Sequence, residues 1–305
     1  MKTSIILATL LGILTTGIAH AQIGGGQYVL NSLDMLLAVQ TIECDLRIET
    51  FVDGKKYIAW GQYTEQALPK VAPNVFLRSV FRLELNFSMN PPKPRDTEPN
   101  RMTRVSYVSE DGNKHQIDSY TAIGGTKSGD TLDLKKLEER LKAANKEGEF
   151  RHVSEVRHLG GLAGMMRQVS NFYEFSSPTQ ENLQDEETIP VWKLMGTLKS
   201  IHRKSLLEKF GGLDTKGHYP LDFPSDIEIW FGRHNDFPYK IRYLRRVSER
   251  SAQKTLLFQE SFYKVLLNNT PILDTGVNSP FAPLKFPNDV FVRDITDSFI
   301  MTLGL

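Results

Sequence analysis

The sequence predicts an α+β fold in which helices cover one face of an antiparallel sheet. Segments of alternating apolar and polar residues, typical of half-buried strands, recur along most of the chain. Asp53-Gly54 and Asp111-Gly112 are hairpin turn signals between such segments. Helical periodicity is confined to the first third and the middle, which argues against a regular β-α-β order.

Composition excludes several classes of protein. The chain has 305 residues, of which 40% are hydrophobic and 24% charged, as in globular proteins rather than disordered, collagenous or multi-span membrane chains. With 37 basic and 36 acidic residues the formal charge is +1, which gives no support to a nucleic-acid partner.

The first 21 residues have the pattern of a cleaved signal peptide. Lys2 precedes an apolar run over 5–13, and Ala19-His20-Ala21 fits a cleavage site. The alternative, a membrane anchor, needs an apolar stretch of about 20 residues. Cys44, the one cysteine, lies 23 residues past Ala21, too far for a lipidated N-terminus. We therefore expect a periplasmic or secreted protein without a lipid anchor, and a buried Cys44.

The N-terminal part predicts one helix followed by long strands. The expected helix spans 31–40, and the expected strands span 42–52, 55–65, 75–87, 101–109 and 114–120. Apolar residues share one face of the first and third strands, with mostly charged residues on the other face. On the apolar face lie Ile42, Cys44, Leu46 and Ile48 of the first strand, and Leu77, Phe81, Leu83 and Leu85 of the third.

The middle predicts two helices. In the first, over 130–146, Leu134, Leu137, Leu141 and Ala144 form an apolar stripe, with Asp130 as its expected cap. The second, over 159–175, contains three glycines followed by Met165 and Met166. Glycines weaken a helix and methionines pack adaptably, so this segment is either a movable cover or a helix packed closely on the sheet. A polar loop over 176–188 follows.

The C-terminal part returns to strands. We expect them over 191–199, 226–232, 239–247, 254–267 and 290–293, with a short helix over 204–210. A basic cluster within the strand over 239–247 permits two interpretations, an anion site or a ladder of cross-strand ion pairs. Its members are Lys240, Arg242, Arg245 and Arg246.

Catalytic and metal motifs do not emerge. His152, Glu155 and His158 have the order H-x-x-E-x-x-H, whereas zinc proteases require H-E-x-x-H. The glycine-rich stretch over 124–129 lacks the glycine before Lys127 that a phosphate loop needs. The chain also lacks the Gly-x-Ser-x-Gly nucleophile elbow. The sequence therefore predicts a protein that is not an enzyme and uses no metal or cofactor.

The ordered combination of features resembles the LolA-like family of periplasmic outer-membrane lipoprotein carriers and their lipid-binding relatives. The features are the leader, the helix, the hairpin over 41–65, the paired strands over 227–243 around Asn235-Asp236-Phe237-Pro238, and a closing pattern over 262–294 with Phe281-Ala282-Pro283 and Phe286-Pro287-Asn288. The resemblance covers about 28–110 and 188–297. The stretch over 130–188 is enlarged, and no binding residue of the carriers can be matched to a position here.

The resemblance implies a curved, half-open antiparallel sheet, a half-barrel whose concave apolar face is covered by helices. It implies one domain over 22–305 that holds lipid or lipoprotein acyl chains without chemistry, with envelope membrane proteins as further partners and a monomeric state. The expected lining of the cavity is Ile42, Leu46, Ile48, Leu77, Phe81, Leu83, Leu85, Met165 and Met166. The alternative is a non-enzymatic envelope interaction module in which the same face is a filled core.

Overall fold

The structure, a computed structural model, describes most of the chain between Gly24 and Thr302. The described residues are 24–52, 55–67, 79–88, 101–108, 113–120, 126–144, 153–184, 188–272, 279–281, 286, 288 and 290–302. The predicted leader and Leu77 lie outside them. Within this part of the chain, 13 strands form one sheet.

The helices and strands follow one another in an order that keeps most of the sheet sequential. The N-terminal half contains α1 (Gly25–Ala38), β1 (Thr41–Val52), β2 (Lys55–Ala67), β3 (Ser79–Ser88), β4 (Arg101–Val108), β5 (Asn113–Tyr120), β6 (Thr126–Asp133) and α2 (Leu134–Ala143). The remainder contains α3 (Val153–Phe172), β7 (Tyr173–Phe175), β8 (Thr179–Gln184), β9 (Thr188–Leu198), α4 (Ser200–Lys209), β10 (Asp226–Gly232), β11 (Pro238–Arg246), β12 (Lys254–Asn268), β13 (Val292–Asp294) and α5 (Thr296–Thr302).

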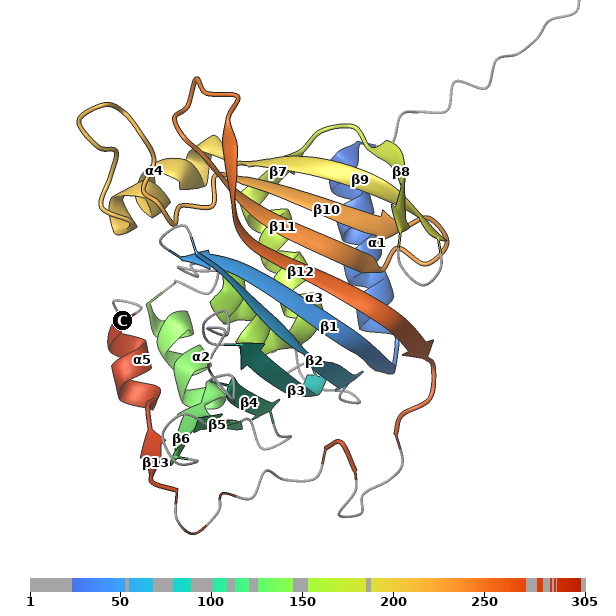
Figure 1. Cartoon of the computed structure of the whole chain (residues 1–305), viewed down its shortest axis with the longest axis vertical. Coiled ribbons are helices and arrows are strands. Elements are labelled where there is room, and N and C mark those ends of the chain that lie inside the picture. The colour runs from blue at the N-terminus through green and yellow to red at the C-terminus, as the bar shows by residue number, and fades with distance from the viewer. Residues whose placement is uncertain are drawn as a thin grey trace, which may run out of the picture.

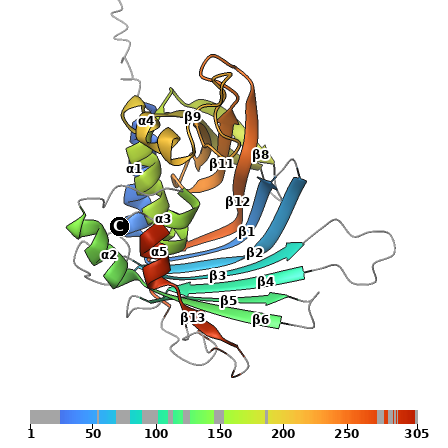
Figure 2. The same cartoon turned by 90° about the vertical axis from the view of Figure 1, so that its left-hand side faces the viewer.

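The sheet is curved and open, as the resemblance implies. Its order is β13-β6-β5-β4-β3-β2-β1-β12-β11-β10-β9-β7, with β8 paired to β9. All pairings are antiparallel except that of β13 with β6. The strands bend around helices α1, α2 and α3, which lie on the concave side (Figures 1 and 2). The α+β half-barrel with helices on its concave face is therefore confirmed.

The hydrophobic core lies between this concave face and the helices. Ile48 pairs with Ala59 and Leu46 with Gly61, so the apolar positions of β1 and β2 point to the same side. The next strand continues this face, because Tyr63 of β2 pairs with Leu83 of β3. Period-two alternation and this register together place the apolar residues inside and the charged residues of β1 outside.

The predicted helix over 130–146 begins four residues later. Residues up to Asp133 belong to β6, in which Asp130 pairs with Gln116. Asp133 caps α2 instead, because its Oδ1 accepts a hydrogen bond of 3.0 Å from the backbone N–H of Lys136. Three members of the predicted stripe, Leu134, Leu137 and Leu141, are buried, whereas Ala144 is exposed.

Other boundaries also differ from the predictions. α1 starts at Gly25, earlier than expected, and α3 spans Val153–Phe172, with β7 in place of its last predicted turn. The predicted loop over 176–188 contains strand β8, an edge strand with five of its six residues exposed, which therefore lacks apolar alternation. Helix α5 was not predicted, because it has only seven residues.

Candidate functional site

The candidate site is the apolar layer between the concave face and helix α3. From the sheet, the predicted lining residues Ile42, Leu46, Ile48, Phe81, Leu83 and Leu85 have exposed fractions of 1–5%. From α3, Met165 and Met166 have exposed fractions of 1% and 0%. All eight belong to one hydrophobic cluster, so the structure brings together every predicted lining residue that it describes.

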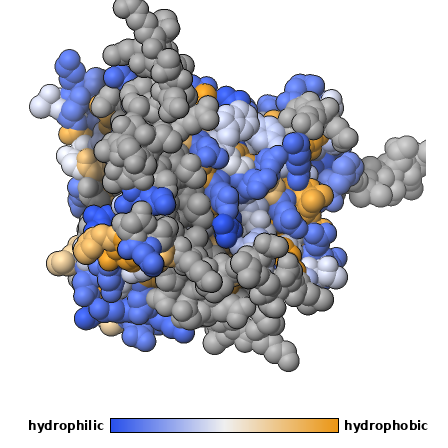
Figure 3. All heavy atoms as spheres, turned by 60° about the horizontal axis from the view of Figure 1, so that its bottom comes forward, coloured by the Kyte–Doolittle hydropathy of each residue, from blue (hydrophilic) through white to orange (hydrophobic). Residues whose placement is uncertain are grey.

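Helices α1 and α3 form the cover of this layer. α1 contributes Val29 and Leu36, while α3 contributes Leu162, Val169 and Phe172, all buried. The two helices contact each other, and α3 contacts β3. Most of the surface turned forward in Figure 3 is hydrophilic where residues are described, with an apolar patch at its left edge.

A buried carboxyl group, Glu65, lies within this apolar layer. On β2 it occupies the concave side, paired with Ile42 of β1 and with Phe81 of β3. Three groups donate hydrogen bonds to it: the Tyr63 hydroxyl at 2.6 Å, the Ser79 hydroxyl, and the backbone N–H of Leu162 at 3.1 Å. Burial raises the pKa of Glu65 above its usual value, although these hydrogen bonds act in the opposite direction.

Glu65 marks the position where α3 is interrupted. Gly161 has φ 61° and ψ −165°, a conformation that is essentially restricted to glycine, so the helix consists of two parts. The second part begins beside Glu65, whose carboxylate accepts one of its first backbone N–H groups. A side chain at position 161 would collide with that carboxylate.

Sequence reasoning did not identify Glu65 or Gly161 as special positions. The available signal was that Glu65 follows Ala59, Gly61 and Tyr63 at intervals of two, on the apolar side of its strand. The three glycines of α3 were recognised, but the pattern does not tell which of them breaks the helix.

The convex face of the sheet carries part of the predicted basic cluster. Lys240 and Arg242 lie over the ring of Trp230, each 5.1 Å from its centroid. Arg242 also pairs with Glu228 at 3.7 Å across the strands, and Lys193 pairs with the same carboxylate at 3.6 Å. Of the two interpretations of the cluster, the structure therefore shows a cross-strand ion pair for Arg242, whereas Lys240 contacts the ring of Trp230.

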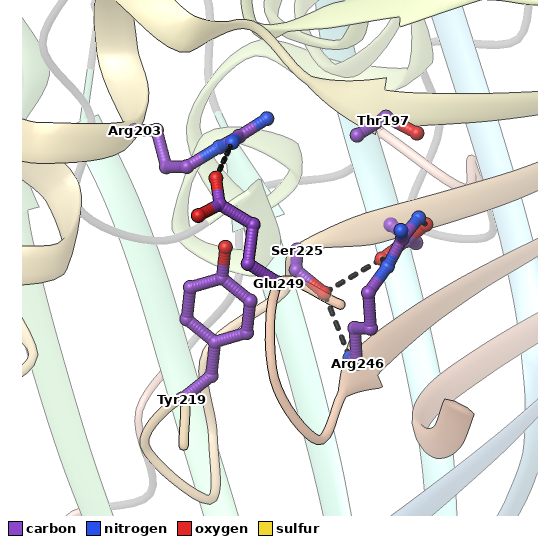
Figure 4. A pocket seen from close by; sticks show the side chains of 7 residues that line it. Thr197, Arg203, Tyr219, Ser225, Arg246 and Glu249 are labelled. Atoms are coloured by element: carbon purple, nitrogen blue, oxygen red, sulfur yellow. Dashed lines mark hydrogen bonds and ion pairs between the residues drawn. The ribbon is translucent and has the colours of Figure 1, made fainter. Parts of the chain in front are cut away.

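Arg246, another member of the cluster, borders a polar pocket at one end of the sheet (Figure 4). This pocket is open to solvent and is lined by Thr197, Arg203, Tyr219, Ser225, Asp226, Arg246 and Glu249. Arg246 pairs at 2.5 Å with Asp226, whose carboxylate also binds Lys254 at 2.9 Å.

The electrostatics of Asp226 follow from these partners. Burial alone would raise the pKa of Asp226, but hydrogen bonds from Arg246, Lys254 and Ser225 outweigh it and hold the pKa below its usual value. The acid is therefore an ionised, fully buried group shared by two cations. Arg245 acts differently, because it donates to the backbone carbonyls of Tyr219 and Pro220.

The described residues contain no group of three His, Cys, Asp or Glu side chains that is arranged to hold a metal ion. His152 lies outside the described residues. Cys44 is buried, as predicted. Of the helices that the structure describes, none combines the length and the apolar character that crossing a bilayer requires.

Comparisons with known proteins gave similarities of structure alone. No protein-family model and no curated protein matches the chain. Similar solved structures include MucB (14% identity, 83% of this chain and 63% of that chain covered, TM-score 0.36) and LprF from Mycobacterium bovis (9% identity, 87% and 96% covered, TM-score 0.34). Another is described as an outer membrane lipoprotein-sorting protein domain from Vibrio parahaemolyticus (10% identity, 78% and 91% covered, TM-score 0.25).

These three likenesses concern the fold alone. The chain spans less than two thirds of MucB, and the identities and TM-scores of all three carry no information about a ligand.

Proposed function

We propose that this chain binds and carries lipid or lipoprotein acyl chains outside the cytoplasm, without chemical conversion. The observation that supports this most is the nature of the cover. The apolar concave face of an open sheet lies under a helix that is broken at Gly161 and presents Met165 and Met166 to it. A broken helix can separate from the sheet in parts, and methionine side chains repack around irregular apolar ligands.

The energetics of such a ligand are favourable. Transfer of an acyl chain of about a dozen methylene groups from water contributes on the order of 10 kcal/mol, at ~0.8 kcal/mol each, before the entropic cost of binding. A non-covalent complex is therefore strong enough for transport. Opening of the cover costs free energy, because Met166 and Val169 lose their contacts with the sheet. Contacts with the ligand replace them.

One observation favours the second candidate, an interaction module with a closed core. The side chains in the layer have exposed fractions of 0–5%, and Leu46, Leu83 and Met165 are each at 1%, as in an ordinary packed interior. In this alternative, α3 is fixed and the functional surface lies elsewhere.

Cys44 provides a sensitive test of the two functions. It is the one cysteine of the chain and lies in the same buried cluster as Leu46 and Met165. If α3 opens locally, a thiol reagent should label Cys44 in native conditions much faster than global unfolding allows, and a bound fatty acid should slow this labelling. Labelling at the rate of global unfolding, with and without fatty acid, would support the closed core.

Two further measurements complete the test. Native mass spectrometry of protein purified from its own host should detect a bound acyl ligand. Hydrogen exchange over 162–172 should be fast in the delipidated protein and slow after loading, whereas equal and strong protection in both states would contradict the movable cover. A matched control is the segment over 227–231 in β10, which should be protected in both states.

A further inference from the structure

A second surface feature lies at the end of the sheet that carries α4. α4, the connection over 211–225 and the turn over 247–253 protrude together beyond β9 to β12 (Figure 1). They are linked to one another, since the backbone N–H of Tyr219 donates to the carbonyl of Val247 at 3.0 Å and His218 forms an isolated bridge with Ser248. We refer to these three segments as the α4 end.

Large aliphatic side chains protrude from the α4 end. Ile201 of α4 has an exposed fraction of 78%, and Leu221 of the connection has 74%. Leu213 is also half exposed, at 49%. The opposite side of α4 packs on the core through Leu206 and Leu207, so the exposure of Ile201 is not a consequence of a loosely attached helix.

The connection that presents Leu213 and Leu221 is ordered by its own hydrogen bonds. Asp214 Oδ1 accepts from the backbone N–H groups of Lys216 and His218, each at 2.8 Å. Further along, Tyr219 stacks on Phe223 with a centroid distance of 5.0 Å. The aliphatic side chains therefore stand on a defined surface.

The α4 end becomes basic together with the residues that flank it. The three segments themselves hold five Lys or Arg and four Asp or Glu. The flanking residues Lys199, Asp226, Arg245, Arg246 and Lys254 add four basic and one acidic side chain, so residues 199–226 and 245–254 together have an excess of four positive charges in a chain whose total is +1. The remainder of the chain is therefore net negative, and the charge is separated along the molecule. Such an asymmetry attracts the basic end to an anionic surface.

The polar pocket of Figure 4 opens within this basic end and contains an arginine with an easily replaced partner. Arg203 Nη1 pairs at 2.5 Å with Glu249, whose side chain is 70% exposed. Exposed ion pairs are weak, so an external oxyanion can compete with this carboxylate. The hydroxyl of Tyr219 points toward the same pair and supplies a further hydrogen-bonding group.

We propose that the α4 end docks on a membrane surface that contains anionic phospholipids. Ile201 and Leu221 enter the interface between headgroups and acyl chains, and a headgroup phosphate replaces Glu249 at Arg203. Nη2 of Arg203 donates to the carbonyl of Leu198 at 3.1 Å, so the phosphate accepts from Nη1, which now pairs with Glu249. The hydrophobic anchors of protein interfaces are typically aromatic, whereas the exposed hydrophobic side chains here are aliphatic.

The proposal rests on these observations and not on acyl binding in the concave layer. A protein that binds anionic vesicles but never contains an acyl ligand would support docking and refute the carrier function. Acyl loading without vesicle binding would do the reverse.

The experiment is co-sedimentation of the whole mature chain with vesicles of phosphatidylcholine, with or without phosphatidylglycerol. We expect binding to the anionic vesicles that weakens with added salt. The double variant Ile201→Ser, Leu221→Ser should bind on the order of tenfold more weakly, because two aliphatic anchors are lost. Met301→Ser is the matched control, since Met301 is 69% exposed on α5, away from this end, and its loss should have no effect.

Two further variants test the pocket. Arg203→Gln should weaken binding by about fivefold, the effect of one basic residue near an anionic membrane. Glu249→Gln should strengthen it, because it removes the competing carboxylate and leaves Arg203 in place. The second variant cannot be explained by misfolding, since a damaged protein would not bind more tightly.

Several results would overturn the proposal. Equal binding to both types of vesicle, or an equal loss in Met301→Ser, would exclude the α4 end as an anionic docking surface. Binding of soluble glycerol phosphate without any vesicle sedimentation would reduce the site to one for free phosphate. Capture of polyglutamate by a protein that ignores vesicles would assign the surface to an acidic protein partner instead.

Discussion

Replacement of Gly161 by alanine tests the description of the broken helix most directly. The backbone at this position has φ 61° and ψ −165°, and a non-glycine residue held in such a region costs about 1–3 kcal/mol. The new Cβ would also collide with the Glu65 carboxylate. Displacing that group disturbs hydrogen bonds from Tyr63, Ser79 and Leu162, each worth ~1 kcal/mol.

Together these effects predict that Gly161→Ala lowers the free energy of unfolding by roughly 4–6 kcal/mol when all three hydrogen bonds are lost. Urea denaturation followed by circular dichroism measures this directly, and the melting temperature should fall by about 2–4 °C for each kcal/mol. The control is Gly26→Ala in α1, where a Cβ meets nothing within 4 Å. It should be neutral or slightly stabilising, by up to ~1 kcal/mol.

The reasoning would be refuted by a Gly161→Ala variant that unfolds within ~0.5 kcal/mol of wild type, the usual scatter of harmless surface changes. Such a result would mean that α3 continues through position 161 and that Glu65 has room to move. An equal loss of stability in Gly26→Ala would also contradict it, because the effect would then not depend on the conformation at the break.

Three further predictions follow from buried groups. Leu46→Asp and Leu83→Asp each place a lone charge in the core and should unfold the protein or cost more than ~3 kcal/mol in urea denaturation, whereas Gln62→Asp on the exposed face should not. Because the pKa of Glu65 is raised in the fold, the native state binds its proton more tightly, so wild-type stability should fall as the pH rises above 4.5, and Glu65→Gln should remove this dependence. Because the pKa of Asp226 is lowered, its contribution is present above pH 3.8 and lost as the pH falls through the lower folded value; Asp226→Asn should remove it and cost ~3 kcal/mol at neutral pH.

The strands of this fold are largely predictable from the sequence, because a local pattern determines which side of a strand each residue occupies. Alternation places Ile42, Leu46 and Ile48 on one side of β1, and burial of that side is the outcome in any sheet with one covered face. Helix α2 was predicted for the same reason, since its leucine stripe is regular. Its start was misplaced because Asp130 and Asp133 have the same capping chemistry, and pairing of Asp130 with β5 decides between them.

The candidate site could be predicted only in part. Its apolar residues share a periodicity, which a single strand or helix reveals. The interaction of Glu65 with Leu162 joins positions 97 residues apart, and nothing local to either residue indicates it. The α4 end is similar, because Arg203, Tyr219 and Arg246 line one pocket only once β10 and β11 have brought their segments together.

The position of β12 has a consequence for the order in which the protein folds. This strand lies in the middle of the sheet, between β1 and β11, although it is among the last strands in the chain. Thr41 must find Asn268 as its partner, a contact across most of the polypeptide. Sequentially distant pairings form slowly, so the hairpins of β1–β6 and of β9–β11 have time to form first as separate halves. Until β12 inserts, β1 and β11 both present open edges of the kind that promote aggregation. Completion of the sheet therefore depends on β12, its last long strand. Until that strand has paired, a chaperone that covers the edges of β1 and β11 would protect the chain from aggregation.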